Sequence, residues 1–126
     1  MINNKLRLAK KKDFEYFFKD ELVPYSAKAW VLCEGKNRIA IGGIWLMPRQ
    51  FTSFVRIKKV ISKRQFWEAS KLVTKELLKL DIPIVCFRDS DKINSKKYLE
   101  KLGYKYFSSS NNQEIYKLWA QQQYLY

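Results

Sequence analysis

Histidine is absent from this chain of 126 residues. Its absence excludes Ser-His-Asp and Cys-His nucleophile pairs and zinc sites built on imidazole, so most hydrolase and metalloenzyme mechanisms lose their central group. Long hydrophobic runs are absent too, because no apolar stretch reaches the roughly 18 residues that a membrane-spanning helix needs. Residues 1–12 are polar and basic and contain no apolar signal segment. We therefore expect a protein that neither spans a membrane nor is secreted.

Cysteine and acidic residues are scarce. Cys33 and Cys86 lie in apolar, strand-like runs without the close spacing of a metal site or the density of a disulfide-rich protein, so we expect two reduced, buried thiols and no metal. Only 12 Asp and Glu stand against 25 Lys and Arg, a formal net charge of +13. This excess predicts an acidic partner, whether a phosphorylated coenzyme, an acidic protein surface or nucleic acid.

The residues that are present predict a single α/β domain over 1–126. Hydrophobic residues make up 47% of the chain, which is enough for one core, and the length is too short for two. Alternating and helical apolar patterns follow one another along the sequence. In order, the patterns predict a strand at 5–9, a helix at 12–22, strands at 29–34, 38–47 and 51–61, a helix between Ser62 and Asp81, a strand at 83–87, a polar loop at 88–92, a helix at 94–102, and strands at 104–107 and 113–119.

Local signals refine these predictions. Ser62 followed by Gln65 is a capping-box pattern for the start of the long helix. The Gly42-Gly43 pair inside a strand indicates a bulge or a close approach of another backbone. Gly103 follows the short helix, where a residue that tolerates positive φ is favoured.

The segment KKYLEKLGYKYF, from Lys96 to Phe107, resembles a region of the GNAT N-acetyltransferases in which an aromatic residue, a Leu-Gly pair and a second aromatic residue recur. Ser95 stands at the small-residue position at the start of that motif. The element order also resembles the GNAT fold, with one of the usual two opening helices shortened or absent. The resemblance implies a mixed central sheet flanked by helices, made of an antiparallel meander and a parallel pair formed by strands 51–61 and 83–87.

Two departures from active GNAT enzymes concern the coenzyme and the catalytic acid. Active members carry an Arg/Gln-x-x-Gly-x-Gly/Ala turn before the long helix, because bare backbone N–H groups must closely approach the acetyl-CoA pyrophosphate. The position of the usual catalytic tyrosine is Leu99, which cannot donate a proton, and this leaves Tyr98 or a water molecule as the candidate acid. The candidate coenzyme-binding residues contain no glycine and are Ser62, Lys63, Arg64, Gln65 and Phe66.

The run from Arg64 to Ser70 and the Tyr98-Leu99 pair are similar to small GNAT-like internal virion and assembly proteins of short-tailed bacteriophages. This resemblance implies a phage accessory or virion-associated protein of the host cytoplasm or the virion. It would bind an acidic phage or host protein, have a degenerate acetyl-CoA site and need no cofactor. The alternative is an active acyl-CoA-dependent N-acetyltransferase that uses acetyl-CoA. Nucleic-acid binding is a third interpretation, although the sequence contains no recognised nucleic-acid motif.

Further residues have both a functional and a structural interpretation. A predicted basic surface either holds phosphates or an acidic partner, or is simply solvated; it consists of Arg56, Lys58, Lys59, Lys63 and Arg64. Aromatic residues that form either a stacking platform or core packing are Trp30, Trp45, Phe54, Phe66 and Trp67. The carboxylates available as a general base are Glu34, Glu68, Asp89 and Asp91.

Overall fold

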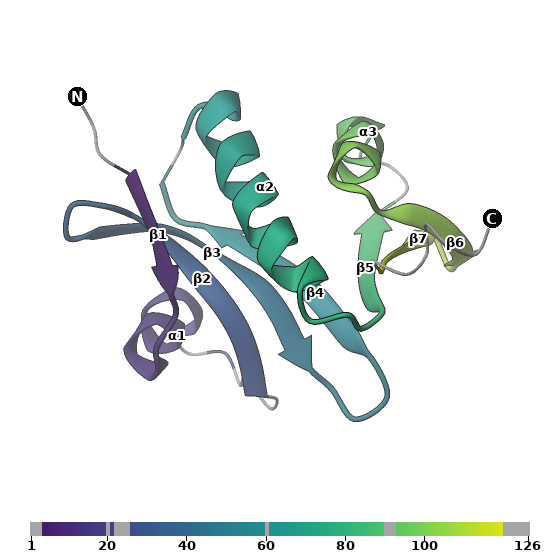
Figure 1. Ribbon diagram of the computed structural model, residues 1–126, viewed down its shortest axis with the longest axis horizontal. Helices are drawn as coiled ribbons and strands as arrows, with labels where there is room; N and C mark the ends of the chain where they lie inside the picture. Colours follow the sequence, from purple (N-terminus) through teal and green to yellow (C-terminus); the bar gives the residue numbers. More distant parts are fainter. Residues whose placement is uncertain (1–3, 20, 22–25, 60, 90–92, 120–126) are drawn as a thin grey trace.

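The computed structural model describes residues 4–19, 21, 26–59, 61–89 and 93–119 (Figure 1). The order of its helices and strands agrees with the order predicted from the sequence. The elements are β1 (Asn4–Leu8), α1 (Lys11–Phe18), β2 (Ser26–Glu34), β3 (Asn37–Leu46), β4 (Phe51–Ile57), α2 (Lys63–Leu78), β5 (Ile84–Asp89), α3 (Ile93–Leu102), β6 (Lys105–Ser110) and β7 (Gln113–Leu118).

Several boundaries differ from the prediction. The strands predicted at 29–34, 51–61 and 104–107 are Ser26–Glu34, Phe51–Ile57 and Lys105–Ser110 in the structure. Helix α1 ends at Phe18 rather than at position 22, because the backbone leaves the helical region at Lys19, where φ is 2° and ψ is −80°. Residues 88 and 89, predicted to begin a loop, continue β5, because the ladder between β5 and β7 extends to the pairs Arg88 with Glu114 and Asp89 with Gln113. The remainder of the predicted loop, 90–92, lies outside the described residues.

Seven strands form one sheet in the order β1-β2-β3-β4-β5-β7-β6. Every neighbouring pair is antiparallel except β4 and β5, which run parallel, so the predicted parallel pair is confirmed. The two strands pair at only two positions, Phe51 with Ile84 and Thr52 with Val85. Beyond these pairs the ladder between β4 and β5 ends, and this divergence positions the site described below.

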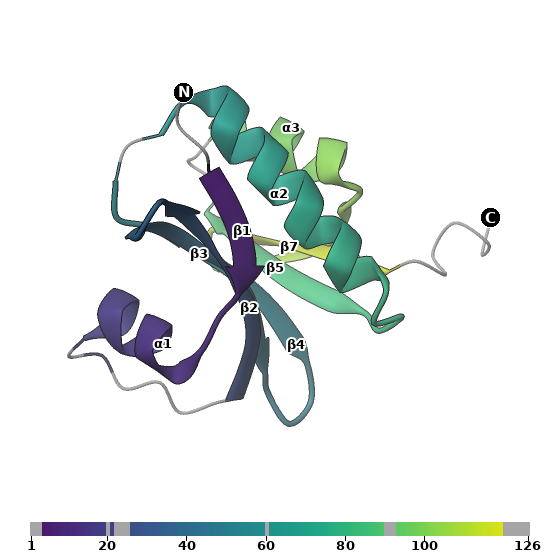
Figure 2. The same cartoon turned by 60° about the vertical axis from the view of Figure 1, so that its left-hand side comes forward.

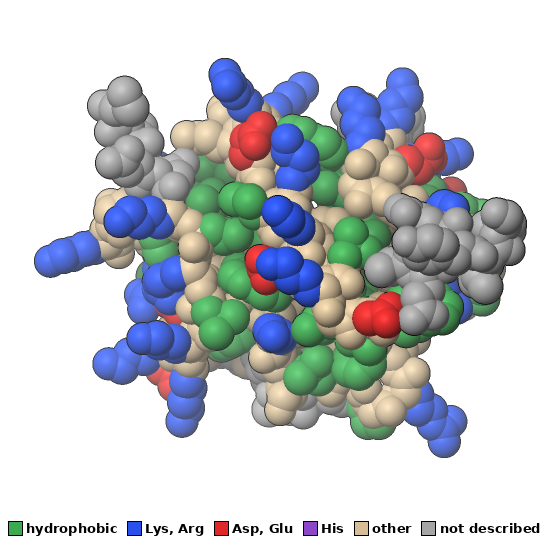
Figure 3. Space-filling model, viewed as in Figure 1, with side chains coloured by type: hydrophobic (Ala, Val, Ile, Leu, Met, Phe, Trp, Pro, Cys, Tyr) green, Lys and Arg blue, Asp and Glu red, His purple; other side chains and the backbone are tan. Residues whose placement is uncertain are grey.

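Helices cover both faces of the sheet, with α1 on one face and α2 and α3 on the other (Figure 2). Under α1, Phe17 and Phe18 pack against the β2 and β3 residues Val31 and Ile41. The core on the opposite face contains Trp30, Ile44, Leu77, Ile84, Leu99, Tyr104, Tyr116 and Leu118. Figure 3 shows that Lys and Arg side chains gather over α2 and α3 on this second face.

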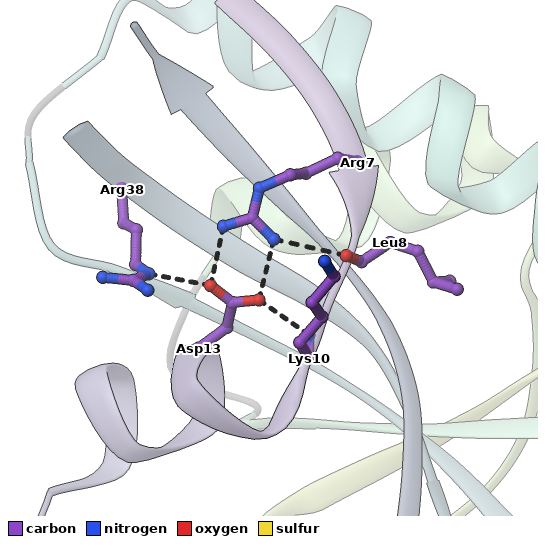
Figure 4. Close-up of polar contacts among 5 residues, drawn as sticks. All are labelled: Arg7, Leu8, Lys10, Asp13 and Arg38. Atoms are coloured by element: carbon purple, nitrogen blue, oxygen red, sulfur yellow. Dashed lines mark hydrogen bonds and ion pairs between the residues drawn. The ribbon is translucent and has the colours of Figure 1, made fainter. Parts of the chain in front are cut away.

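A buried carboxylate joins α1 to the sheet (Figure 4). Asp13 is 1% exposed and accepts two hydrogen bonds from Arg7, at 2.8 and 2.7 Å, and one from Arg38, at 2.7 Å. It also accepts the Lys10 backbone N–H at 2.7 Å, which caps the helix. The Arg7 hydrogen bonds, then those from Arg38 and Lys10, hold the pKa of Asp13 well below its ordinary value despite the opposing effect of burial.

The Gly42-Gly43 pair marks a close approach of two backbones. A Cβ on Gly43 would lie 2.2 Å from the Lys28 carbonyl oxygen and 2.5 Å from Ala29 Cα on β2. The irregularity in this hairpin occurs elsewhere, between Leu32 and Cys33. Of the two predicted alternatives, the close approach is therefore the one observed at this pair.

The local predictions for Gly103 and for two free thiols agree with the structure. Gly103 has φ +106°, the left-handed region that favours glycine after a helix. Cys33 and Cys86 are both free thiols, as predicted, Cys33 buried and Cys86 partly buried. None of the described helices is long and apolar enough to cross a membrane. The described residues also contain no group of three or more His, Cys, Asp or Glu that could hold a metal ion.

Candidate functional site

The divergence of β4 and β5 is accompanied by a cavity of about 360 Å³ beneath α2 and α3. Its walls are mainly apolar side chains from the sheet and the two helices. Val55 on β4 and Phe87 on β5 line the cavity beyond the last residues at which β4 and β5 pair. Their side chains are 56% and 41% exposed, so the cavity opens to solvent beside them. The polar groups in its lining come from Ser53, Ser70, Thr74, Cys86, Tyr98 and Tyr104.

One polar cluster lies between the two diverging strands. Ser53 on β4 donates to the Val85 carbonyl oxygen at 3.4 Å, and its hydroxyl lies near the Cys86 thiol and the Tyr104 phenol. Burial raises the pKa of Tyr104 well above its ordinary value and raises that of Cys86, and the nearby Ser53 hydroxyl opposes both shifts only in part. Both groups therefore stay protonated at neutral pH. The cavity thus contains two neutral donors and no charged group from this cluster.

A second polar contact joins α2 to α3. The Tyr98 hydroxyl donates a hydrogen bond to the Ser70 hydroxyl. The Tyr98 ring stacks on Phe66, with centroids 5.2 Å apart and planes 24° apart, and meets Trp67 edge-on at 5.7 Å. Burial, and after it the proximity of Tyr104, raises the pKa of Tyr98 well above its ordinary value. Tyr98 therefore lines the cavity as a neutral phenol, and its hydroxyl proton is already donated to Ser70.

The start of α2 is occupied by its own capping box, as predicted. Gln65 N–H donates to the Ser62 hydroxyl at 3.1 Å, and the Ser62 N–H donates to the Gln65 side chain at 3.3 Å. One of the N–H groups that a phosphate would need is therefore already bonded within the protein. Lys63 and Arg64 are exposed, whereas Phe66 packs on Tyr98. This turn contains no glycine, so it lacks the bare backbone that a glycine-rich turn presents to the acetyl-CoA pyrophosphate and does not fit that group in the same way.

Leu99 is buried in the core, only 8% exposed, and also lines the cavity. It occupies the place where the sequence resemblance puts a tyrosine. The apolar side chain contributes packing between α3 and the sheet but has no proton to donate. Of the two neighbouring residues, Tyr98 alone brings a hydroxyl to the cavity.

The five residues of the predicted basic surface do not form one surface. Arg56 forms an ion pair with Glu21 and lies 4.4 Å from the centre of the Phe18 ring, which places it on the α1 face of the sheet. Lys59 lies 3.5 Å from Glu34 near the β2–β3 hairpin. Lys58 is exposed just after β4, and only Lys63 and Arg64 lie on α2. The structure therefore brings two of the five together on the helical face.

Two of the carboxylates named from the sequence, Glu34 and Glu68, do not line the cavity. Glu34 is paired with Lys59, and Glu68 lies 3.5 Å from Lys71 on the exposed face of α2. Asp89 ends β5, and Asp91 lies outside the described residues. Glu34 and Glu68 are therefore not placed in the cavity as a general base would need to be.

The aromatic residues named from the sequence separate into three groups. Trp30 belongs to the core beneath α2. Trp45 and Phe54 stack under α1, with centroids 4.1 Å apart. Phe66 and Trp67 pack against Tyr98 between the helices. They contribute packing at three places and do not make one stacking platform.

Sequence reasoning missed most of the polar lining of the cavity. Ser53, Ser70 and Tyr104 were not candidates, and Cys86 was interpreted only as a buried thiol. Tyr104 had a signal, because it is the second aromatic residue of the motif that follows the Leu-Gly pair. Ser53 had none, since one serine in an alternating strand does not reveal which neighbour its hydroxyl will meet.

No protein-family model matches the chain, and no curated protein matches it. Solved structures match in fold. The ribosomal-protein-S18-alanine N-acetyltransferase from Escherichia coli has a TM-score of 0.70 at 11% identity, with 94% of each chain covered. An N-acetyltransferase from Staphylococcus aureus Mu50 has a TM-score of 0.70 at 10% identity, covering 94% of this chain and 98% of that chain. A putative acetyltransferase from Salmonella typhimurium, solved with its cofactor acetyl-CoA, has a TM-score of 0.64 at 9% identity, covering 93% of this chain and 94% of that chain.

These structural similarities establish the fold of the chain but not its function. The seven-stranded mixed sheet, its single parallel pair and the three flanking helices make up the α/β fold of the GNAT N-acetyltransferases. The predicted fold class is therefore confirmed. Function has to be argued from the site of this chain, because one fold hosts many functions.

Proposed function

We propose that this chain is a GNAT-fold accessory protein that works by binding a partner and that does not transfer acetyl groups at an ordinary enzymatic rate. The observation that carries this proposal is the contact of Tyr98 with Ser70, Phe66 and Trp67. It joins α2 to α3 next to the helix start that would hold the pyrophosphate, and we infer that it obstructs that group. The acetyl-CoA site is thus degenerate at its phosphate end.

The chemistry of the cavity supports the same proposal. The position of the usual acid is Leu99, and loss of a positioned general acid costs on the order of 10²- to 10⁴-fold in rate. Tyr98 is a poor replacement, because burial raises its pKa and its proton is bonded to Ser70. Binding and proton transfer are therefore both weakened at this site.

The partner we propose is an acidic protein surface, on a phage or a host protein. The formal net charge of +13 favours such a partner through long-range attraction. The phage role rests on the sequence pattern from Arg64 to Ser70 together with the Tyr98-Leu99 pair. In this role the protein acts in the host cytoplasm or in the virion and needs no cofactor.

An active acyl-CoA-dependent N-acetyltransferase is the second candidate, and the cavity favours it. Its volume of about 360 Å³ and its apolar walls are compatible with a short acyl chain on an uncharged thioester arm. The hydroxyls of Tyr98 and Tyr104 both line it. In this case Lys63 and Arg64 would replace the missing glycines at the phosphate end, and Tyr98 would be the acid.

Calorimetry with two ligands separates the candidates. Acetyl-CoA tests the whole site, and S-acetylpantetheine, which lacks the nucleotide, tests the cavity alone. We expect no acetyl-CoA binding below millimolar concentration and no thiol release over a panel of amine, amino-acid and peptide acceptors. Micromolar binding of acetyl-CoA with steady turnover would contradict the accessory role.

Two variants identify the reason for either result. Tyr98→Phe removes the remaining phenol, and Leu99→Tyr restores one at the usual position. Turnover by the unmodified protein that is lost in Tyr98→Phe would establish the acetyltransferase candidate with Tyr98 as its acid. If no variant turns over, a protein that co-purifies with the parent and is lost with Lys63→Glu and Arg64→Glu would support the partner-binding role.

A further inference from the structure

A row of cations follows the outer face of α2, and the proposed function uses only Arg64 among them. Arg64, Lys71, Lys75 and Lys79 are exposed and are separated by seven, four and four residues. At about 100° and 1.5 Å per residue, they lie within about 80° around the helix and extend over about 22 Å along it. We call these four side chains the α2 ridge. Figure 3 shows Lys and Arg side chains in line over this helix.

The acidic residues nearby do not neutralise the ridge. Glu68 lies 3.5 Å from Lys71, and Glu76 lies 3.1 Å from Lys79. Such exposed pairs contribute about 0–1 kcal/mol, so another anion can displace the glutamates. Helix α3 lies on the same face of the sheet (Figure 1). Its exposed Lys96, Lys97 and Lys101 bring more cations. Between them, positions 63–79 and 93–102 hold eight Lys and Arg against three Glu.

The chemistry of the α2 ridge distinguishes between two kinds of acidic partner, a protein surface and a nucleic acid. A protein interface normally has an apolar or aromatic centre surrounded by polar residues. On the exposed face of α2, Leu72, 52% exposed, is the single large apolar side chain that stands out among the described residues. A phosphate backbone is recognised by positive charge alone. A row of charged heads without an apolar centre therefore fits a nucleic acid better than a protein.

We propose that the α2 ridge binds the phosphodiester backbone of nucleic acid without reading its sequence. The phosphates of one strand recur every 3.4 Å or so along a duplex axis, so a ridge of about 22 Å spans about six of them. Four cations along that length can each neutralise a phosphate. This inference does not depend on the proposed function, because the ridge lies on the outer face of α2 and the cavity lies beneath the helix.

Fluorescence anisotropy with a labelled 20-base-pair DNA duplex tests the proposal over 50–200 mM NaCl. Four phosphate contacts predict a slope of about −3.6 in a plot of log K against log salt concentration, and a loss of affinity on the order of 100-fold over that range. The triple variant Lys71→Gln, Lys75→Gln, Lys79→Gln should reduce the slope to about −1. Glutamine is a good helix former, so α2 is retained, as circular dichroism would verify.

A second triple variant, Lys11→Gln, Lys12→Gln, Lys36→Gln, is the matched control. It removes the same charge from exposed positions at the start of α1 and in the β2–β3 turn. We expect its slope to stay near that of the parent. If the two triple variants lost equal amounts of affinity and of salt dependence, net charge alone would drive binding and the proposal would be overturned. An absence of binding at 50 mM NaCl with tens of micromolar protein would overturn the proposal as well. Stronger displacement of the duplex by poly-L-glutamate than by unlabelled DNA of equal charge would also overturn it and would indicate an acidic protein partner.

Discussion

Tyr98 on α3 donates its hydroxyl hydrogen bond to Ser70 on α2. The two helices belong to the same face of the sheet but are far apart in sequence, so this bond is part of what sets their separation beside the cavity. Phe66 and Trp67 pack against the same ring. The contact joins α2 to α3 at the wall of the cavity.

The first prediction concerns the stability of this contact. Tyr98→Phe and Ser70→Ala should each lower the free energy of unfolding by about 0.5–1.5 kcal/mol, because each removes one side of a partly buried hydrogen bond. The double variant should cost less than the sum, since the bond can be lost only once. Urea denaturation of the four proteins measures this. Strictly additive losses would show that the two hydroxyls do not interact.

The second prediction concerns the coenzyme. Phe66→Ala removes the ring stacked on Tyr98 and opens the space beside the start of α2. The melting temperature should fall in the absence of ligand, while the upward shift caused by millimolar acetyl-CoA should become larger than in the parent. Phe107→Ala, on the exposed edge strand β6, is the control and should leave the acetyl-CoA shift unchanged. An identical shift in Phe66→Ala and the parent would mean that the ring does not obstruct the coenzyme.

The third prediction concerns Asp13 and pH. Asp13→Asn should lower the free energy of unfolding by about 3 kcal/mol. This value is near the lower end for a broken buried ion pair, because Arg7 and Arg38 are 41% and 29% exposed and can be solvated. The folded pKa of Asp13 lies below its unfolded value of about 3.9, so its stabilisation is complete above about pH 5 and is lost as the pH falls toward the folded pKa.

Unfolding free energies measured between pH 2 and 7 test both parts of this prediction. The parent should lose stability below about pH 5 more steeply than Asp13→Asn, and the two curves should converge in acid. Glu15→Gln, on the exposed side of the same helix, is the control and should follow the parent. Parallel curves for the parent and Asp13→Asn would contradict the low pKa of the carboxyl.

The fourth prediction compares two neighbouring glycines. Gly43→Ala places a Cβ 2.2 Å from the Lys28 carbonyl oxygen, and a backbone atom in a paired strand cannot move aside without breaking the ladder. We expect a loss of at least about 3 kcal/mol or failure to fold. For Gly42→Ala the nearest atom is the Phe54 carbonyl oxygen at 3.6 Å, an ordinary contact, so the change should stay within about 1 kcal/mol. Equal effects of the two substitutions on thermal stability would contradict the close approach at Gly43.

Local sequence determined the elements of this fold. The Ser62 and Gln65 pair fixed the start of α2, and apolar spacing within the helix and alternation within the strands fixed the other elements. These patterns act over a few residues, so the chain alone is sufficient to specify them. The absence of glycine between Ser62 and Trp67 and the leucine at position 99 are likewise visible in the sequence, and from them we predict a degenerate coenzyme site.

Tertiary structure decided which side chains meet. Arg56 was expected beside Lys63 and Arg64, but strand alternation turns it to the α1 face, where Glu21 and Phe18 hold it. The bond between Tyr98 and Ser70 and the cluster of Ser53 with Cys86 and Tyr104 join elements that only the packed sheet brings together. Short-range patterns set the conformation of each segment, whereas the faces of the sheet and the divergence of β4 from β5 set the partners of each side chain. The cavity and its polar groups are therefore properties of the packed molecule and of no single stretch of its sequence.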